Sequence, residues 1–85
     1  MNEFNYIITD QYGIHARPAG LLVKEAQKYK SAISIKKNNL SADAKKIFSI
    51  MKLAAKHNET IIITCCGEDE TEAAQAIDAF LKANL

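Results

Sequence analysis

A histidine, the chain's only arginine and its only proline lie within four positions of one another, at His15, Arg17 and Pro18. Proline lacks an amide hydrogen and holds φ near a helical value, so it favours the first turn of a helix. A helix that begins here places His15 next to its N-cap position. The first amides of such a helix, those of Ala16 and Arg17, have no partner within the helix and can bind an anion.

These residue types suit phosphoryl chemistry. The Arg17 guanidinium is always charged and can clamp phosphate oxygens with several hydrogen bonds. An imidazole is largely neutral near physiological pH, which leaves it nucleophilic. We therefore interpret His15 as the acceptor of a phosphoryl group. The alternative is that a histidine in this position is only a helix cap or a solvated side chain. This chemistry requires no metal and no cofactor, and the sequence shows no metal-ligand spacing.

The pattern of apolar residues predicts the elements that position this segment. Alternation of apolar and polar residues indicates strands over residues 4–9, 31–37, 40–43 and 60–66. Helical spacing indicates helices over residues 16–28 and 44–53, and a third helix that follows Asp69. The order β-α-β-β-α-β-α predicts an α+β fold. It is a two-layer open-faced sandwich, with a four-stranded antiparallel sheet covered on one face by three helices.

Several details accompany this prediction. Asn38 and Asn39 suit a tight hairpin turn, because asparagine tolerates positive φ. Asp69, followed by Glu72 three positions on, matches a capping box. The adjacent cysteines are expected to be reduced, one facing inward and one outward. The side chains expected in the core are Tyr6, Ile8, Ala19, Leu22, Val23, Ala26, Tyr29, Ile33, Ile35, Ile50, Leu53, Ile61, Ile63, Cys65, Ala73, Ile77, Phe80 and Leu81.

Size and charge narrow the function classes. The 85 residues correspond to a single domain, residues 1–85, for which a monomer is the simplest expectation. A formal net charge of +1 gives no strong attraction to nucleic acid. No apolar run is long enough to span a bilayer, and the N-terminus does not resemble a signal peptide. We therefore expect no membrane insertion and a cytoplasmic location.

The whole chain resembles the HPr family, the histidine-containing phosphocarriers of the bacterial phosphoenolpyruvate:sugar phosphotransferase system. The segment GIHARPA at residues 13–19 resembles the family's active-site signature. The segment IFSIMKL at residues 47–53 falls where the family has its short second helix, and GEDE at residues 67–70 resembles the turn into its third.

The resemblance implies a covalent carrier rather than a stand-alone enzyme. Enzyme I would pass a phosphoryl group to Nδ1 of His15, and the carrier would pass it on to enzyme IIA components. Arg17 would stabilise the group during and after transfer. Two alternatives stay open: a paralogue serving a regulatory or nitrogen-related phosphotransferase chain, and a module that regulates a partner by docking alone.

A carrier of this kind needs a docking surface around its histidine. Lysines at positions 24, 45, 46, 52 and 56 are either a basic rim that steers an acidic partner or simply a solvated face. Exposed apolar residues in this area indicate a partner. The residues expected to dock are Ala16, Gly20, Leu21, Ile47, Phe48 and Met51. The alternative is that Ile47 and Met51 belong to the core.

Two positions depart from the family pattern. Many Gram-positive members carry at position 46 a serine that HPr kinase phosphorylates, whereas this chain has Lys46. We therefore expect no regulatory serine and no control by HPr kinase. Tyr12 stands where the family often has a small polar residue, and it either lines the site or only covers the loop. His57 lies in a loop, where we expect it to be solvated.

Overall fold

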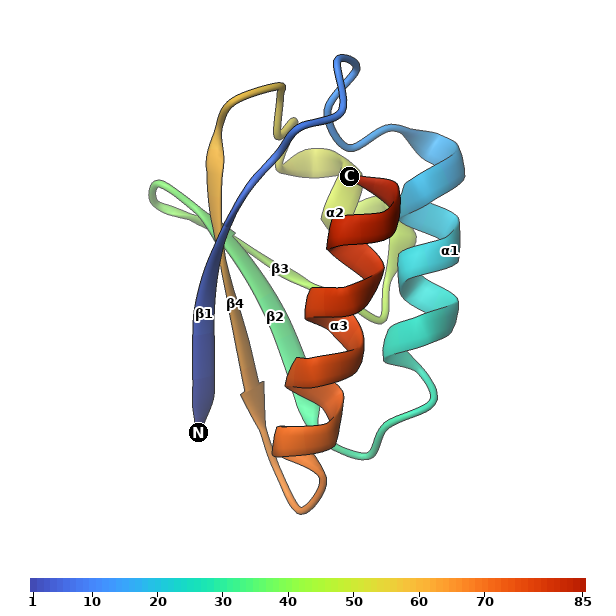
Figure 1. Ribbon diagram of the computed structural model, residues 1–85, viewed down its shortest axis with the longest axis vertical. Coiled ribbons are helices and arrows are strands. Elements are labelled where there is room, and N and C mark those ends of the chain that lie inside the picture. Colours follow the sequence, from blue (N-terminus) through green and yellow to red (C-terminus); the bar gives the residue numbers. More distant parts are fainter.

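The computed structural model describes residues 1–85 and contains four strands and three helices in the predicted order. The two layers are visible in Figure 1, with all three helices on one face of the sheet. The predicted fold class is confirmed. The elements are β1 (Asn2–Ile7), α1 (Ala16–Ala26), β2 (Ala32–Lys37), β3 (Leu40–Asp43), α2 (Ile47–Lys52), β4 (Thr60–Cys66) and α3 (Glu70–Asn84).

The sheet is antiparallel throughout, with the strand order β1-β4-β2-β3. The β2–β3 hairpin turns at Asn38, which has a positive φ of 54°, as expected for asparagine in a tight turn. In the centre of the sheet, Ile35 pairs with Ile63 of β4 and with Ala42 of β3. Ile35 and Ile63 are fully buried, because alternate residues of each strand face the helical layer.

One cluster of 20 buried apolar residues fills the space between the sheet and the helices. It confirms most of the predicted core, including Cys65, while Cys66 is exposed; both thiols are free. Four predicted core residues are only half-buried and pack against the cluster: Tyr6, Val23, Tyr29 and Phe80. The Tyr6 hydroxyl donates a hydrogen bond to the Leu81 carbonyl oxygen at 2.9 Å, which joins β1 to α3.

The first strand covers Asn2–Ile7 rather than the predicted residues 4–9. The chain leaves the sheet after Ile7 because its backbone finds partners at the other end of the sequence. The amides of Thr9 and Asp10 donate to the main-chain oxygen of Leu85 at 2.6 and 2.8 Å. This junction starts the loop that leads to His15.

The first two helices are shorter than predicted. The second is only Ile47–Lys52, because the Ala44 amide donates to the Ile33 carbonyl oxygen of β2 at 2.9 Å and Ala44 lies in a turn after β3. The first ends at Ala26, and residues 27–30 form turns rather than a further helical turn. Apolar periodicity cannot distinguish such turns from helix, because both place the same side chains in the core.

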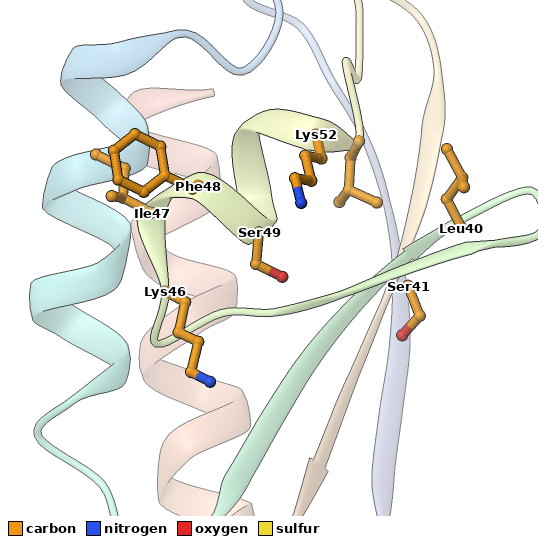
Figure 2. A pocket seen from close by; sticks show the side chains of 8 residues that line it. Leu40, Ser41, Lys46, Ile47, Phe48, Ser49 and Lys52 are labelled. Carbon is orange, nitrogen blue, oxygen red and sulfur yellow. The ribbon is translucent and has the colours of Figure 1, made fainter.

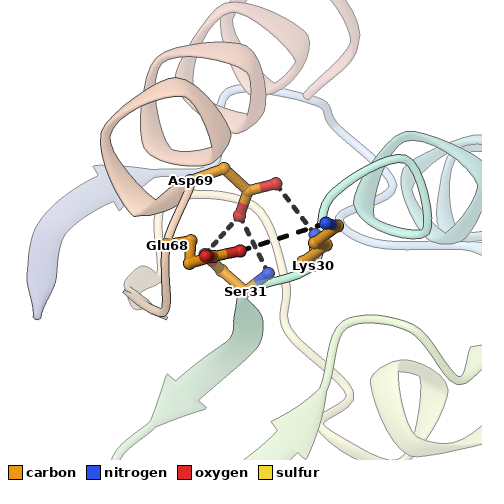
Figure 3. A network of polar contacts seen from close by, with 4 residues as sticks. All are labelled: Lys30, Ser31, Glu68 and Asp69. Atoms are coloured by element: carbon orange, nitrogen blue, oxygen red, sulfur yellow. Dashed lines mark hydrogen bonds and ion pairs between the residues drawn. The ribbon is translucent and has the colours of Figure 1, made fainter.

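The predicted capping box at the start of α3 is wrong. Asp69 is at the N-cap position, but its side chain makes no capping hydrogen bond. Its carboxylate instead accepts hydrogen bonds from the amides of Lys30 and Ser31, both at 2.9 Å, and from the Ser31 hydroxyl (Figure 3). These donors lower the pKa of Asp69 to about 2, with the Ser31 hydroxyl contributing most. Asp69 therefore ties α3 to the residues just before β2, and the Gly67 amide donates to the Glu70 carboxylate at 3.3 Å.

Candidate functional site

The predicted histidine lies at the N-cap of α1. His15 has an extended backbone (φ −115°, ψ 179°), and its side chain makes no capping hydrogen bond. The first amide bonded within the helix is that of Ala19, which donates to the His15 carbonyl oxygen at 3.0 Å. Pro18 has no amide hydrogen, so the amides of Ala16 and Arg17 are the two free donors at this helix end.

Arg17 completes a positive site beside the imidazole. Its side chain is exposed and forms no ion pair. Arg17 and His15 both line a small cavity of about 210 Å³. A free guanidinium, two free amides and the positive end of the helix dipole can together hold a dianionic phosphoryl group. The other residues that line the cavity are Asp10, Pro18, Leu21 and Asn84.

The loop before His15 is anchored to the core on its far side. Gly13 has a φ of 68°, in the region that favours glycine, and its amide donates to the Asp10 carbonyl oxygen at 3.0 Å. The next amide, that of Ile14, donates to the Ala55 carbonyl oxygen at 2.9 Å, and the Ile14 side chain is buried. His15 is therefore held between a buried neighbour and the rigid helix that follows.

Two residues of this loop flank the imidazole. Nε2 of His15 lies 3.8 Å from Oδ1 of Asp10, and the His15 side chain is 44% exposed. The Tyr12 ring meets the imidazole edge-to-face, with ring centroids 5.9 Å apart and planes at 80°. Tyr12 thus lines the site, one of the two roles that the sequence left open for it. Sequence reasoning missed Asp10 and Asn84; an aspartate three positions before a glycine is a turn signal, but nothing local indicates Asn84.

The predicted docking residues differ in exposure. Ala16, Leu21, Phe48 and Met51 are exposed, and Phe48, at 79%, is the most exposed of the three large side chains. Ile47 is half-buried and packs against the core cluster. A methyl group placed on Gly20 would lie 3.7 Å from Cδ1 of Ile47, so Gly20 faces α2 as much as any partner.

A larger groove adjoins this patch, between α2 and the β2–β3 hairpin (Figure 2). Its volume is about 700 Å³. Lys46 and Lys52 border it, and neither lysine forms an ion pair. Lys45, by contrast, donates to the Tyr29 carbonyl oxygen at 2.7 Å, just beyond the C-terminal end of α1. The lysines of the predicted rim therefore do not form one set: Lys46 and Lys52 are free, and Lys45 is tied to the fold.

The remaining expectations concern metals, membranes and His57. The structure holds no cluster of three or more histidine, cysteine, aspartate or glutamate side chains arranged to bind a metal ion. None of the helices combines the length and apolar character needed to cross a bilayer. His57 is exposed in its loop, as expected.

The sheet, its helical layer and the histidine at the N-terminus of the first helix define a small α+β domain of the open-faced sandwich class. The family model described as the PTS HPr component phosphorylation site matches residues 2–83. The chain belongs to the HPr family of phosphocarrier proteins of the phosphotransferase system.

Individual relatives agree over nearly the whole chain. The phosphocarrier protein HPr of Mycoplasma genitalium is 41% identical, over 99% of this chain and 97% of its own length. The HPr of Mycoplasma capricolum is 44% identical, over 91% of this chain and 86% of its own. The solved structure of a mycoplasma histidine-containing phosphocarrier protein superposes with a TM-score of 0.94 at 40% identity, covering 96% of this chain and 93% of that one.

Proposed function

We propose that this chain accepts a phosphoryl group from phosphorylated Enzyme I on Nδ1 of His15 and donates it to enzyme IIA components. The observation that carries the proposal is the combination at the start of α1. An imidazole free of capping bonds lies beside two free amides, those of Ala16 and Arg17, and an unpaired guanidinium. A helix cap or a solvated histidine needs none of these free donors.

The site supports transfer through position and charge. The phosphoryl group on His15 would meet the N-terminal end of α1, where free amides and the dipole favour negative charge. The Arg17 guanidinium can contact its oxygens without first breaking an ion pair of its own. Phosphoryl transfer depends mainly on such positioning and electrostatic stabilisation.

The docking surface is proposed to surround this site. Leu21, Phe48 and Met51 expose apolar side chains on α1 and α2, beside the histidine's helix end. Lys46 and Lys52 add positive charge along the adjoining groove, which favours an acidic partner surface. The same face would serve both donor and acceptor, one after the other.

The test is intact-mass spectrometry after mixing the protein with Enzyme I, magnesium and phosphoenolpyruvate, with a His15→Ala variant as control. We expect one added phosphoryl group that is labile in acid and absent from the variant. No addition, with an Enzyme I that charges another HPr, would contradict the proposal.

A carrier charged from phosphoenolpyruvate, a cytoplasmic metabolite, would work in the cytoplasm.

The two alternatives make different predictions for the same protein. A paralogue of a regulatory or nitrogen-related chain would be charged by its own Enzyme I and refused by that of the sugar system. A docking-only module would bind partners equally well with His15→Ala and would never take up the group. The unpaired Arg17 favours the carrier, because docking alone does not need a phosphate clamp.

We further propose that this carrier lacks control by HPr kinase. Lys46 occupies the N-cap of α2, where it offers no hydroxyl and places a positive charge at the positive end of a helix. Phosphoserine in that position would have the opposite charge. Incubation with HPr kinase and ATP should leave the mass unchanged, and a phosphoserine would refute this point.

A further inference from the structure

The carboxylate of Asp10 occupies one side of the His15 ring. Its Oδ1 is 3.8 Å from Nε2 and accepts a hydrogen bond from the Tyr12 amide at 2.8 Å. The Asp10 backbone is fixed as well, since its amide donates to the Leu85 main-chain oxygen and its carbonyl accepts from the Gly13 amide. The carboxylate is therefore held in place from both its side chain and its backbone.

From this geometry we propose that Asp10 is a positioning residue that keeps the ring proton of His15 on Nε2 and so leaves the Nδ1 lone pair free to react. A neutral imidazole carries one proton, and a carboxylate beside one nitrogen favours the tautomer with the proton there. Neither ring nitrogen makes a hydrogen bond in the structure, and Nε2 is the one that lies 3.8 Å from Asp10 Oδ1. The inference rests on the proposed function, in which Nδ1 is the phosphoryl acceptor.

The same contact stabilises the product of transfer. The Nδ1 lone pair forms the new N–P bond, and the electron pair of the breaking bond stays with the donor. The proton remains on Nε2, so the phosphorylated ring carries a formal positive charge that faces Asp10. A carboxylate oriented in this way stabilises an imidazolium, as it does where an aspartate orients a catalytic histidine.

Several groups surround the ring. Asp10 Oδ1 lies 3.8 Å from Nε2, and Arg17 lines the same small cavity as Asp10 and His15, next to the free amides at the start of α1. Tyr12 contributes an aromatic edge or face, and α3 contributes the neutral Asn84 and the chain end at Leu85. Asp10 is thus the side chain placed to act on the Nε2 proton.

Asp10→Asn tests this role without removing the loop's hydrogen bond. An asparagine oxygen can still accept from the Tyr12 amide, while the negative charge is lost. Asp43→Asn is the matched control, because Asp43 Oδ1 accepts from the Lys45 amide two residues on, at 2.9 Å, with no histidine beside it. Urea unfolding of both variants checks that the fold is retained.

The readout is the tautomer of His15 from long-range ¹H–¹⁵N correlation spectra at pH 8.5, well above the ordinary pKa of an imidazole. We expect the proton mainly on Nε2 in the wild type and in Asp43→Asn, and a several-fold larger Nδ1–H population in Asp10→Asn. For Asp10→Asn, the kcat of phosphorylation by Enzyme I should fall on the order of tenfold, with little change in KM. Losses of this size are typical when a group that orients a functional histidine is removed. Identical tautomer populations in wild type and Asp10→Asn would overturn the inference.

The two readouts separate this inference from the proposed function. Failure of the wild type to take up a phosphoryl group would refute the carrier role, while the spectra would still decide what Asp10 does to the ring. Efficient phosphorylation with unchanged tautomers would leave the carrier role standing and refute the role of Asp10.

Discussion

Replacing Gly13 by alanine should both destabilise the protein and slow its phosphorylation. A methyl group on Gly13 would overlap the Ala55 carbonyl oxygen and lie 2.7 Å from Cα of Lys56. The residue also has a φ of 68°, which costs a non-glycine residue about 1–2 kcal/mol. Relief of the overlap by a backbone shift adds roughly 1–3 kcal/mol. The sum is about 2–5 kcal/mol.

The same change reaches the reactive residue through one hydrogen bond. The carbonyl oxygen that the methyl group would displace is the acceptor of the Ile14 amide, and His15 follows directly. A displacement of about 1 Å at a reacting group can slow transfer on the order of 100-fold. We therefore expect phosphorylation of Gly13→Ala by Enzyme I to be about 10- to 100-fold slower at a temperature where the variant is fully folded.

Urea unfolding and a phosphorylation time course measure the two effects, and Gly20→Ala is the control for the stability measurement. A methyl group on Gly20 meets only Cδ1 of Ile47, at an ordinary 3.7 Å, and alanine stabilises a helix interior relative to glycine by about 0.5–1 kcal/mol. The two glycine-to-alanine changes should thus move stability in opposite directions. A Gly13→Ala variant as stable and as fast as the wild type would refute the reasoning that this loop is held by close backbone packing.

Three further predictions concern the core, the docking surface and acid stability. Ile63→Ala removes a side chain from the fully buried face of β4 and should lower the free energy of unfolding in urea by about 2–5 kcal/mol. Ile62→Ala, on the half-buried outer face, should lower it clearly less. Equal losses would contradict the assigned sheet faces. Phe48→Ala should change the free energy of unfolding by less than about 0.5 kcal/mol, because the side chain is exposed. It should weaken Enzyme I binding, measured by calorimetry, roughly tenfold. Unchanged binding would show that Phe48 is not part of the docking surface. Because the pKa of Asp69 is lowered to about 2 from 3.8, its contribution to stability is present above pH 4 and lost as the pH falls toward 2. The difference in unfolding free energy between wild type and Asp69→Asn should therefore shrink over that range, and a constant difference would contradict it.

The layers of the fold could be predicted because each element buries one face. Alternation in residues 60–66 places Ile61, Ile63 and Cys65 in the core, and the structure has them there. Helical spacing similarly located α1 by Ala19, Leu22 and Ala26. The ends of the elements were predicted less well. The first helix ends at Ala26, and Ala44 lies in a turn because its amide bonds to a distant strand.

Charged side chains were harder to place than apolar ones. Asp69 matched a capping box by spacing, but its carboxylate accepts hydrogen bonds from the amides of Lys30 and Ser31 instead of capping the helix. Those amides are 39 and 38 positions away in sequence. Spacing describes local partners only, so a carboxylate with a choice between local and distant donors cannot be assigned from sequence.

The candidate site shows the same difference between local and long-range contacts. His15, Arg17 and Pro18 are predictable because their chemistry depends on one helix end and on neighbours in sequence. The orientation of the ring depends on contacts that join distant parts of the chain. Leu85 holds the backbone of Asp10, and Ala55 holds that of Ile14. Local opening of the last turn of α3 would therefore release the Asp10 side of the imidazole while the central strands stay paired. A reactive histidine on a rigid helix end, flanked by a loop fixed from two remote elements, has a defined orientation only when the whole domain is folded.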